Sequence, residues 1–144
     1  MSYEHYSRVY SSIWAEPWTE NMRTLAFYLV TGPQRRTEGL YRLPLAYVEG
    51  DLDWQPKRLK AVLGALTAEG FVEHDPKAQL VLLVNALKRN GLNTKQRIGV
   101  VKAFRELPPS PLLERFVSLS REFNQQLWED LAEAFPSIVE SLAN

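Results

Sequence analysis

The feature that most constrains the fold of this chain is an amphipathic helix that leads directly into a hairpin. Four apolar residues recur with the i, i+3, i+4, i+7 spacing of one helix face, and they are Leu59, Val62, Leu63 and Leu66. Gly70 is typical of the residue just past a helix end, and apolar runs follow at residues 71–73 and 80–84. Because the turn-forming residues 74–77 separate these two runs, the segment predicts a helix followed by a β-hairpin.

Three shorter segments precede this helix. Residues 17–31 carry apolar side chains at helical spacing, with a proline in the first turn, and predict a helix. Residues 39–43 predict a brief strand, and residues 45–49 predict one or two helical turns that Gly50 ends. Asp53 is suited to cap the next helix. The order helix, short strand, short helix, helix, hairpin is that of a winged helix, a helix-turn-helix motif whose trailing hairpin forms the wing.

The residues after the hairpin predict further helices. Residues 94–107 have the pattern of a helix capped by Thr94, and the proline-rich residues 108–111 end it. A longer amphipathic helix follows from Leu112, with Pro136 as a later break. Its apolar stripe consists of Phe116, Leu119, Phe123, Leu127 and Leu131. Because such a stripe is too large to leave in water, it either folds back on the domain or pairs with a second copy, and we expect a homo-oligomer.

The pattern as a whole predicts a mainly α fold with a small β-hairpin, which is an α+β class. We expect a winged helix-turn-helix domain at residues 1–87, followed by C-terminal helices. The helical extension at residues 88–144 would contain a basic helix, a proline-rich break and the amphipathic helix.

Composition excludes several classes of protein. The chain has 17 basic and 17 acidic residues, so its overall charge gives no argument for nucleic acid. The charges are uneven, however, since residues 86–105 contain basic residues and no acidic one, whereas the charged residues after Leu107 are mostly acidic. The absence of cysteine excludes disulfides, thiolate metal sites and a cysteine nucleophile. No signal peptide or membrane-spanning run is present, so we expect a cytoplasmic protein without a membrane partner.

No group of residues predicts catalysis. His5 and His74 lie far apart, and neither has neighbours suited to metal binding or nucleophilic chemistry, so structural or solvated roles are expected. The glycines are isolated at turns and form no phosphate loop. Asp51 and Asp53 lack the further oxygen ligands of a cation site and are explained as turn and cap residues. We therefore expect no enzyme activity, no cofactor and no metal.

The predicted DNA contacts lie at the start of the second helix of the turn motif, because that end faces base edges in the major groove. They are Gln55, Lys57, Arg58, Lys60 and Ala61. Gln55 suits adenine and Arg58 suits guanine, whereas lysines suit phosphate oxygens. Cations that would extend the contact across phosphates are Lys77 at the wing turn and Lys88, Arg89, Lys95 and Arg97 beyond it. The same helix face also fits an ordinary solvated surface, and this alternative stays open.

Aromatic residues are expected in the core rather than on a surface that stacks on bases. Trp54, next to the expected cap, is expected to pack under the neighbouring turn. The other aromatic residues of this kind lie on predicted apolar faces or in the entry segment, and they are Trp14, Trp18, Phe27, Tyr28 and Tyr41.

Six short blocks stand in a recognisable order along the chain. They are residues 13–18 (IWAEPW), 25–31 (LAFYLVT), 39–45 (GLYRLPL), 63–73 (LGALTAEGFVE), 85–89 (NALKR) and 107–116 (LPPSPLLERF). Together they resemble the winged-helix domain of phage replication initiators, also called replisome organisers, over about residues 9–116. The resemblance implies a DNA-binding module that recognises a replication origin, helps to assemble a replicative helicase or helicase loader, and has no active site.

Two other functions fit the same pattern. A transcriptional regulator can use the same fold, and the neighbouring genes would distinguish it from a replication protein. A winged helix that has lost DNA affinity can act as a protein-interaction adaptor or inhibitor, and the neutral net charge favours this reading.

Overall fold

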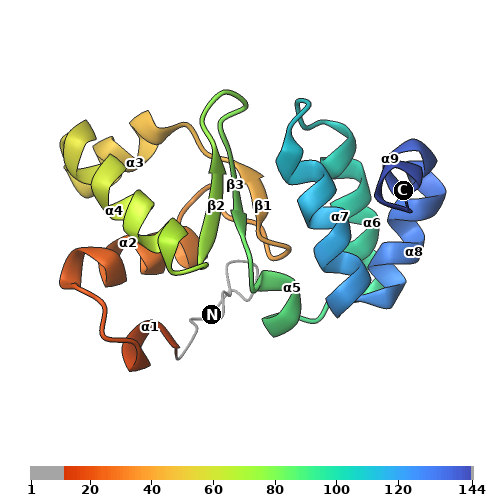
Figure 1. The fold of residues 1–144 in the computed structure, drawn as a ribbon, viewed down its shortest axis with the longest axis horizontal. Helices are drawn as coiled ribbons and strands as arrows, with labels where there is room; N and C mark the ends of the chain where they lie inside the picture. The colour runs from red at the N-terminus through yellow and green to blue at the C-terminus, as the bar shows by residue number, and fades with distance from the viewer. Residues whose placement is uncertain (1–11, 144) are drawn as a thin grey trace.

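The computed structural model describes residues 12–143 and places helices on both sides of a small sheet (Figure 1). The N-terminal part contains α1 (Ser12–Ala15), α2 (Glu20–Thr31), β1 (Leu40–Arg42), α3 (Leu45–Leu52), α4 (Pro56–Ala68), β2 (Val72–Asp75) and β3 (Leu80–Leu83). The C-terminal part contains α5 (Ala86–Arg89), α6 (Thr94–Arg105), α7 (Pro111–Phe123), α8 (Gln125–Ala134) and α9 (Pro136–Ala143). The described chain is mainly helical with a small antiparallel sheet, which confirms the predicted α+β class.

The sheet has three antiparallel strands in the order β1-β3-β2. β2 and β3 form the predicted hairpin, with His74 opposite Val81, and β1 pairs with the other edge of β3, with Tyr41 opposite Val81. Asp75 shapes the hairpin turn, because its carboxylate accepts hydrogen bonds from the backbone N–H groups two and three residues further on, at 3.1 and 3.3 Å. The order of elements from α2 to β3 is the predicted one.

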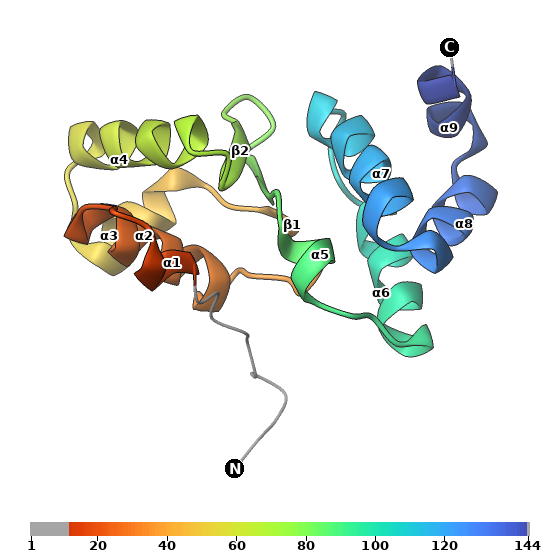
Figure 2. The same ribbon diagram turned by 60° about the horizontal axis from the view of Figure 1, so that its bottom comes forward.

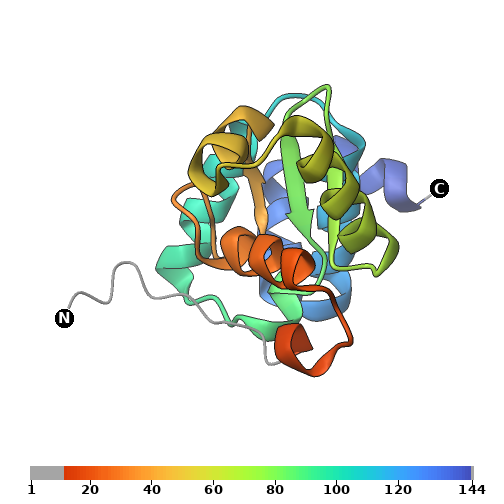
Figure 3. The same cartoon turned by 90° about the vertical axis from the view of Figure 1, so that its left-hand side faces the viewer.

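Both faces of the central strand β3 are buried, and this explains why it is apolar without alternation. Val81 and Leu83 belong to a core that also contains residues of α2 and α4. Leu80 and Leu82, which alternate with them, belong to a second core with residues of α6, α7 and α8. Figure 3 shows α2 and α4 in front of the sheet, and Figure 2 shows the C-terminal helices on its other side.

The prediction of one long helix between Leu112 and Pro136 is wrong, because that segment forms α7 and α8, whereas the predicted break at Pro136 is confirmed by the start of α9. The chain breaks at Asn124, whose side chain accepts a hydrogen bond from the backbone N–H of Leu127 at 3.0 Å and caps α8. The apolar stripe is thereby folded into the second core, and its buried members are Phe116, Leu119, Leu127 and Leu131. Since these side chains are covered by the chain itself, the stripe gives no ground for self-association.

Three helix ends in the N-terminal part differ from the predicted ones. α2 begins after Thr19 rather than at Pro17, because the Thr19 hydroxyl caps it by accepting a first-turn N–H at 3.2 Å. Gly50 lies inside α3 and does not end it. Asp53 ends α3 in the left-handed conformation, with φ of 55°, so the residue at the N-cap position of α4 is Gln55.

α6 also begins differently from the prediction. Its cap is Asn93 rather than Thr94, because the Asn93 side chain accepts the backbone N–H of Gln96 and the Gln96 side chain accepts the backbone N–H of Asn93, both at 2.8 Å. This reciprocal pair is a capping box, which sequence inspection did not identify. The helix ends at Arg105, two residues before the predicted end.

The aromatic residues expected in the core divide into two groups. Trp18 and Tyr41 are buried as predicted, and Tyr28 is half-buried. Trp14 and Phe27 are exposed over 64% and 44% of their surfaces, so their predicted core positions are wrong. α1 and α2 therefore present aromatic side chains to the surroundings.

Candidate nucleic-acid interface

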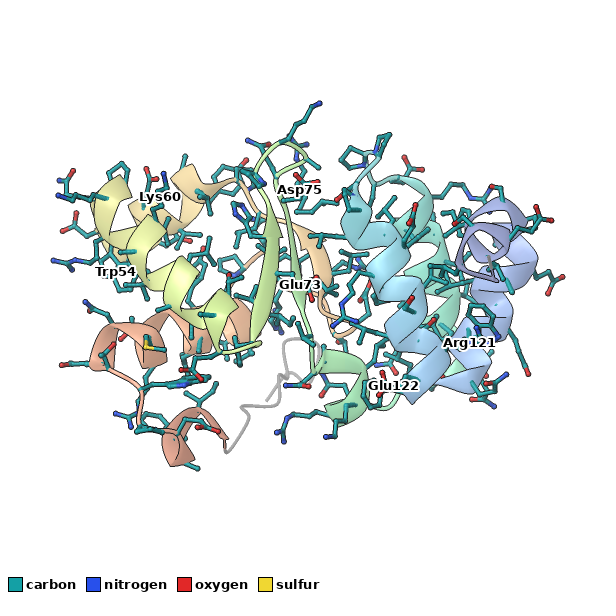
Figure 4. The ribbon with its side chains drawn as sticks, in the orientation of Figure 1. Trp54, Lys60, Glu73, Asp75, Arg121 and Glu122 are labelled. Atoms are coloured by element: carbon teal, nitrogen blue, oxygen red, sulfur yellow. The ribbon has the colours of Figure 1, made fainter. Side chains whose placement is uncertain are left out.

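The five predicted contact residues on α4 share its exposed side. The buried side packs against α2 and β2 and consists of Leu59, Val62, Leu63 and Leu66. This packing fixes the rotation of the helix, and the residues that it leaves exposed include Gln55, Lys57, Arg58, Lys60 and Ala61. Figure 4 shows Lys60 at the end of the molecule away from the C-terminal helices. The five residues predicted from the sequence therefore form a cluster of exposed polar and small side chains on α4.

The start of α4 carries cations at the end of the helix that favours anions. Lys57, Arg58 and Lys60 lie near its first turn, no acid lies in that turn, and Pro56 occupies its first position. Free N–H groups and the macrodipole make this end of a helix positive. The ion pairs found among residues 12–143 join other side chains, so these three cations lack an acidic partner there. An external anion would relieve this accumulation of positive charge.

Trp54 supports Arg58 and offers no stacking surface. Its side chain is buried in the core beneath α4, which confirms the predicted packing role. The Arg58 guanidinium lies over the indole ring, 5.7 Å from its centroid, in cation–π geometry. This contact restrains the Arg58 side chain beside the start of the helix.

A glycine in the middle of α4 leaves the exposed side of the helix flat. Gly64 is exposed, and a Cβ at this position would meet nothing within 4 Å. Glycine in a helix interior costs about 0.5–1 kcal/mol relative to alanine, so internal packing does not explain its presence. Ala61 and Ala68 lie on the same side at helical spacing. Small side chains along this face allow a partner surface to approach the helix backbone closely.

The hairpin presents Lys77 and is fastened to the C-terminal helices. Lys77 is exposed in the turn, as predicted. The Ser110 hydroxyl donates a hydrogen bond to the Asp75 carboxylate at 2.6 Å, and Arg115 on α7 pairs with Glu73 at 2.9 Å. The Ser110 hydrogen bond holds the pKa of Asp75 below its ordinary value. These contacts hold the turn, and hence the Lys77 backbone, in one position.

Arg42 is a second cation beside the turn, and sequence reasoning missed it. It is exposed at the end of β1, opposite Leu80, and its guanidinium donates a hydrogen bond to the Gln79 side-chain oxygen at 2.9 Å. Strand alternation puts Arg42 on the same face of β1 as Leu40, which belongs to the second core, and Arg42 is exposed at the end of that strand. The pairing of β1 with β3 brings Arg42 to the turn, and no local pattern predicts that pairing.

The predicted cations beyond the hairpin do not join this surface. α5 lies at the opposite end of the sheet from the turn (Figure 1), which places Lys88 and Arg89 away from Lys77. Lys95 is exposed in the first turn of α6, on the other side of the sheet from α4. The fold therefore does not place α4 and all of these cations on one surface that could contact the same DNA segment.

Arg97 has a structural role. Its guanidinium donates to Asp130 at 2.9 Å and to the side-chain oxygen of Gln126 at 3.1 Å, and its side chain is mostly buried. These contacts join α6 to α8. We therefore leave Arg97 out of the candidate interface.

Other chemistry finds little support in the described part of the chain. Among residues 12–143, no group of three or more His, Asp and Glu side chains is placed to hold a metal ion. His74 is half-buried on β2, where burial lowers its pKa, and His5 lies outside the described residues. Within the same range, no helix is long and apolar enough to cross a membrane.

No protein-family model matches the chain, and no curated protein or solved structure is significantly similar to it.

Proposed function

We propose that this chain binds DNA and inserts the start of α4 into the major groove. The observation that carries the proposal is the group Lys57, Arg58 and Lys60, which lies at the positive end of a helix without an acidic partner in the described chain. Duplex DNA offers phosphates to such a group and acceptor atoms along its base edges. Gly64 adds support, because a flat helix face admits close approach to a groove.

We further propose that the fold is a winged helix. The order of elements from α2 to β3 and the strand order β1-β3-β2 support this assignment. α3 and α4 would then be the two helices of the turn motif, and the β2–β3 hairpin would be the wing. In that arrangement the N-terminal residues of α4 face the base edges.

The proposed contacts divide between base reading and backbone binding. Arg58 suits bidentate hydrogen bonds to guanine, and Gln55 suits adenine. The small side chain of Ala61 leaves room for the DNA to approach the helix beside these contacts. The cations proposed for phosphate contacts are Lys57, Lys60 and Lys77.

The resemblance to phage replication initiators favours replication-origin binding over transcriptional regulation. A helicase or helicase loader as partner is a prediction that rests on this resemblance alone, and self-association stays a prediction. A regulator would use the same α4 contacts on another DNA site. The proposal includes no active site and no cofactor.

A matched pair of double variants tests the proposal. Lys57→Ala/Lys60→Ala removes two exposed lysines from α4, and Lys88→Ala/Lys102→Ala removes two exposed lysines from α5 and α6, so the formal charge changes equally. Binding of each protein to a fluorescent duplex is measured by anisotropy at several salt concentrations. We expect the α4 variant to bind at least ~10-fold more weakly and to reduce the salt slope by about 2, with the control within about threefold of the parent.

A folded α4 variant that binds as tightly as the parent would show that α4 does not enter the groove. Equal losses in the two double variants would indicate non-specific attraction instead. Arg58→Ala separates base reading from phosphate binding, because loss of a bidentate contact to guanine relaxes the preference at one base pair. Selection from a random-sequence duplex library measures that preference.

An exposed aromatic groove favours a second candidate, a protein-interaction adaptor. Trp14 and Phe27 line a groove of about 720 Å³ between α1, α2 and the end of α3. Exposed apolar surface of this kind is typical of protein interaction sites. A parent protein that binds no duplex at low salt would support the adaptor and exclude the DNA-binding proposal.

A further inference from the structure

A cleft rich in arginine lies between α6 and the loop at residues 33–39. Two adjoining hollows of about 320 and 290 Å³ make up the cleft, and Arg35 and Arg36 line both of them. Arg42 lines the larger hollow, and Gly99 on α6 lines the smaller one. Among the described residues that line the cleft, the only acid is Glu38.

Glu38 is occupied in holding Arg36. Its carboxylate accepts a hydrogen bond from the Arg36 Nε at 2.7 Å, and the side chain of Glu38 is 5% exposed whereas that of Arg36 is 41% exposed. Burial of a carboxylate is costly unless it is paired, so this acid is tied to its partner. The Arg36 guanidinium also donates to the Gly99 carbonyl at 3.4 Å. Because Arg36 lines both hollows and is restrained in this way, its remaining N–H groups can bind a ligand at little further cost in side-chain entropy.

Arg42 approaches the same hollow from the sheet. Its guanidinium is held by the Gln79 side-chain oxygen at 2.9 Å. The larger hollow is therefore lined by two guanidinium groups, each restrained by a neighbouring acceptor. The planar fork of N–H donors on arginine matches the oxygens of phosphate, and paired forks bind it strongly.

Gly99 is an independent sign that a ligand approaches the cleft. It lies in the middle of α6, where glycine is less favourable than alanine, and a Cβ at this position would meet nothing within 4 Å. Internal packing therefore does not require glycine here. Without a side chain, the α6 backbone stays accessible from the smaller hollow.

We propose that this cleft binds phosphate groups, with Arg36 and Arg42 as their ligands. The source is either a free phosphorylated molecule or the backbone of a nucleic-acid strand, which present the same phosphate oxygens. The proposal goes beyond duplex recognition by α4 and does not depend on it, because α6 and the loop lie across the sheet from α4.

A titration followed by NMR tests the proposal. Inorganic phosphate is added to the ¹⁵N-labelled full chain at constant ionic strength, and the resonances of the Gly99 amide and the Arg36 Nε–H are followed. We expect saturable shifts at both groups. Arg36→Gln/Glu38→Gln replaces the ion pair with neutral amides and should weaken phosphate binding at least ~10-fold, because the charged fork is lost. Lys88→Ala, on α5, should leave it unchanged.

A second titration distinguishes the sources. If twelve-residue oligothymidylate shifts the same two resonances and competes with phosphate, the source is a nucleic-acid strand; if phosphate alone does so, it is a free phosphorylated molecule. Should the double variant fail to fold, Arg42→Ala serves instead, since that side chain is exposed. The absence of shifts at Gly99 and Arg36 with both ligands, or unchanged phosphate affinity in the folded variants, would overturn the proposal.

Discussion

Replacing Gly64 with alanine should stabilise the protein and weaken its binding to duplex DNA. The position is in the middle of α4, its φ is not in the left-handed region, and the added Cβ would meet nothing within 4 Å. The substitution therefore gains the helix preference of alanine over glycine, about 0.5–1 kcal/mol. For a chain of this length the gain corresponds to a rise in Tm of about 2–3 °C.

The effect on binding has the opposite sign because the methyl group projects from the exposed face of α4. If a groove edge lies against this face, even a methyl group displaces it, and Gly64→Gln displaces it further. We expect a loss of several-fold for alanine and of at least ~10-fold, about 1.4 kcal/mol, for glutamine. Thermal unfolding followed by circular dichroism gives the stability, and fluorescence anisotropy with duplex gives the affinity.

Gly50→Ala is the matched control, because Gly50 also lies inside a helix, α3, with open space at its Cβ position. It should raise Tm by a similar amount without changing duplex affinity. The result that refutes the reasoning is a Gly64→Gln variant that unfolds near the parent temperature and binds duplex as tightly as the parent. In that case the flat face of α4 is merely solvated.

Three further predictions concern the C-terminal helices. The pKa of Asp75 is lowered from 3.8, so its contribution to stability is present above that value and is lost as pH falls through the lowered pKa. Ser110→Ala removes the main cause of the lowering, and the dependence of Tm on pH between about 2 and 6 should become flatter; an unchanged slope would contradict this. Arg97→Ala should destabilise by about 1 kcal/mol in urea unfolding with duplex affinity intact, whereas a large loss of affinity would return Arg97 to the interface. Leu131→Ala should cost about 2–5 kcal/mol without changing the sedimentation mass, and dissociation of an oligomer at unchanged stability would show that the stripe is an interface.

Local patterns were sufficient for the elements that form the candidate interface. The spacing of Leu59, Val62 and Leu66 predicted both α4 and its buried side, and this in turn predicted which cations are exposed. The paired apolar runs around a turn predicted the hairpin. These signals succeed because helix and hairpin are determined by neighbours in sequence.

Long-range contacts account for what the sequence did not reveal. The cleft forms because Arg36 meets Gly99, which lies far along the chain and carries no side chain to signal the contact. Trp14 and Phe27 are as apolar as core residues, and only the packing of α2 decides that they are exposed. The break at Asn124 involves neither glycine nor proline, because a side-chain cap is sufficient to start α8 there.

Side chains from both sides of the predicted boundary after residue 87 share one core. Leu40, Leu80 and Leu82 are at most 2% exposed, and they share a core with residues of α6, α7 and α8. Exposing a leucine side chain forfeits about 1.5–3 kcal/mol, so uncovering three would cost roughly 4–9 kcal/mol. The whole stability of a domain is only about 5–15 kcal/mol. The hairpin would also lose its contacts with Ser110 and Arg115. The helices after residue 87 therefore hold the hairpin in place, and the proposed DNA-binding unit includes them.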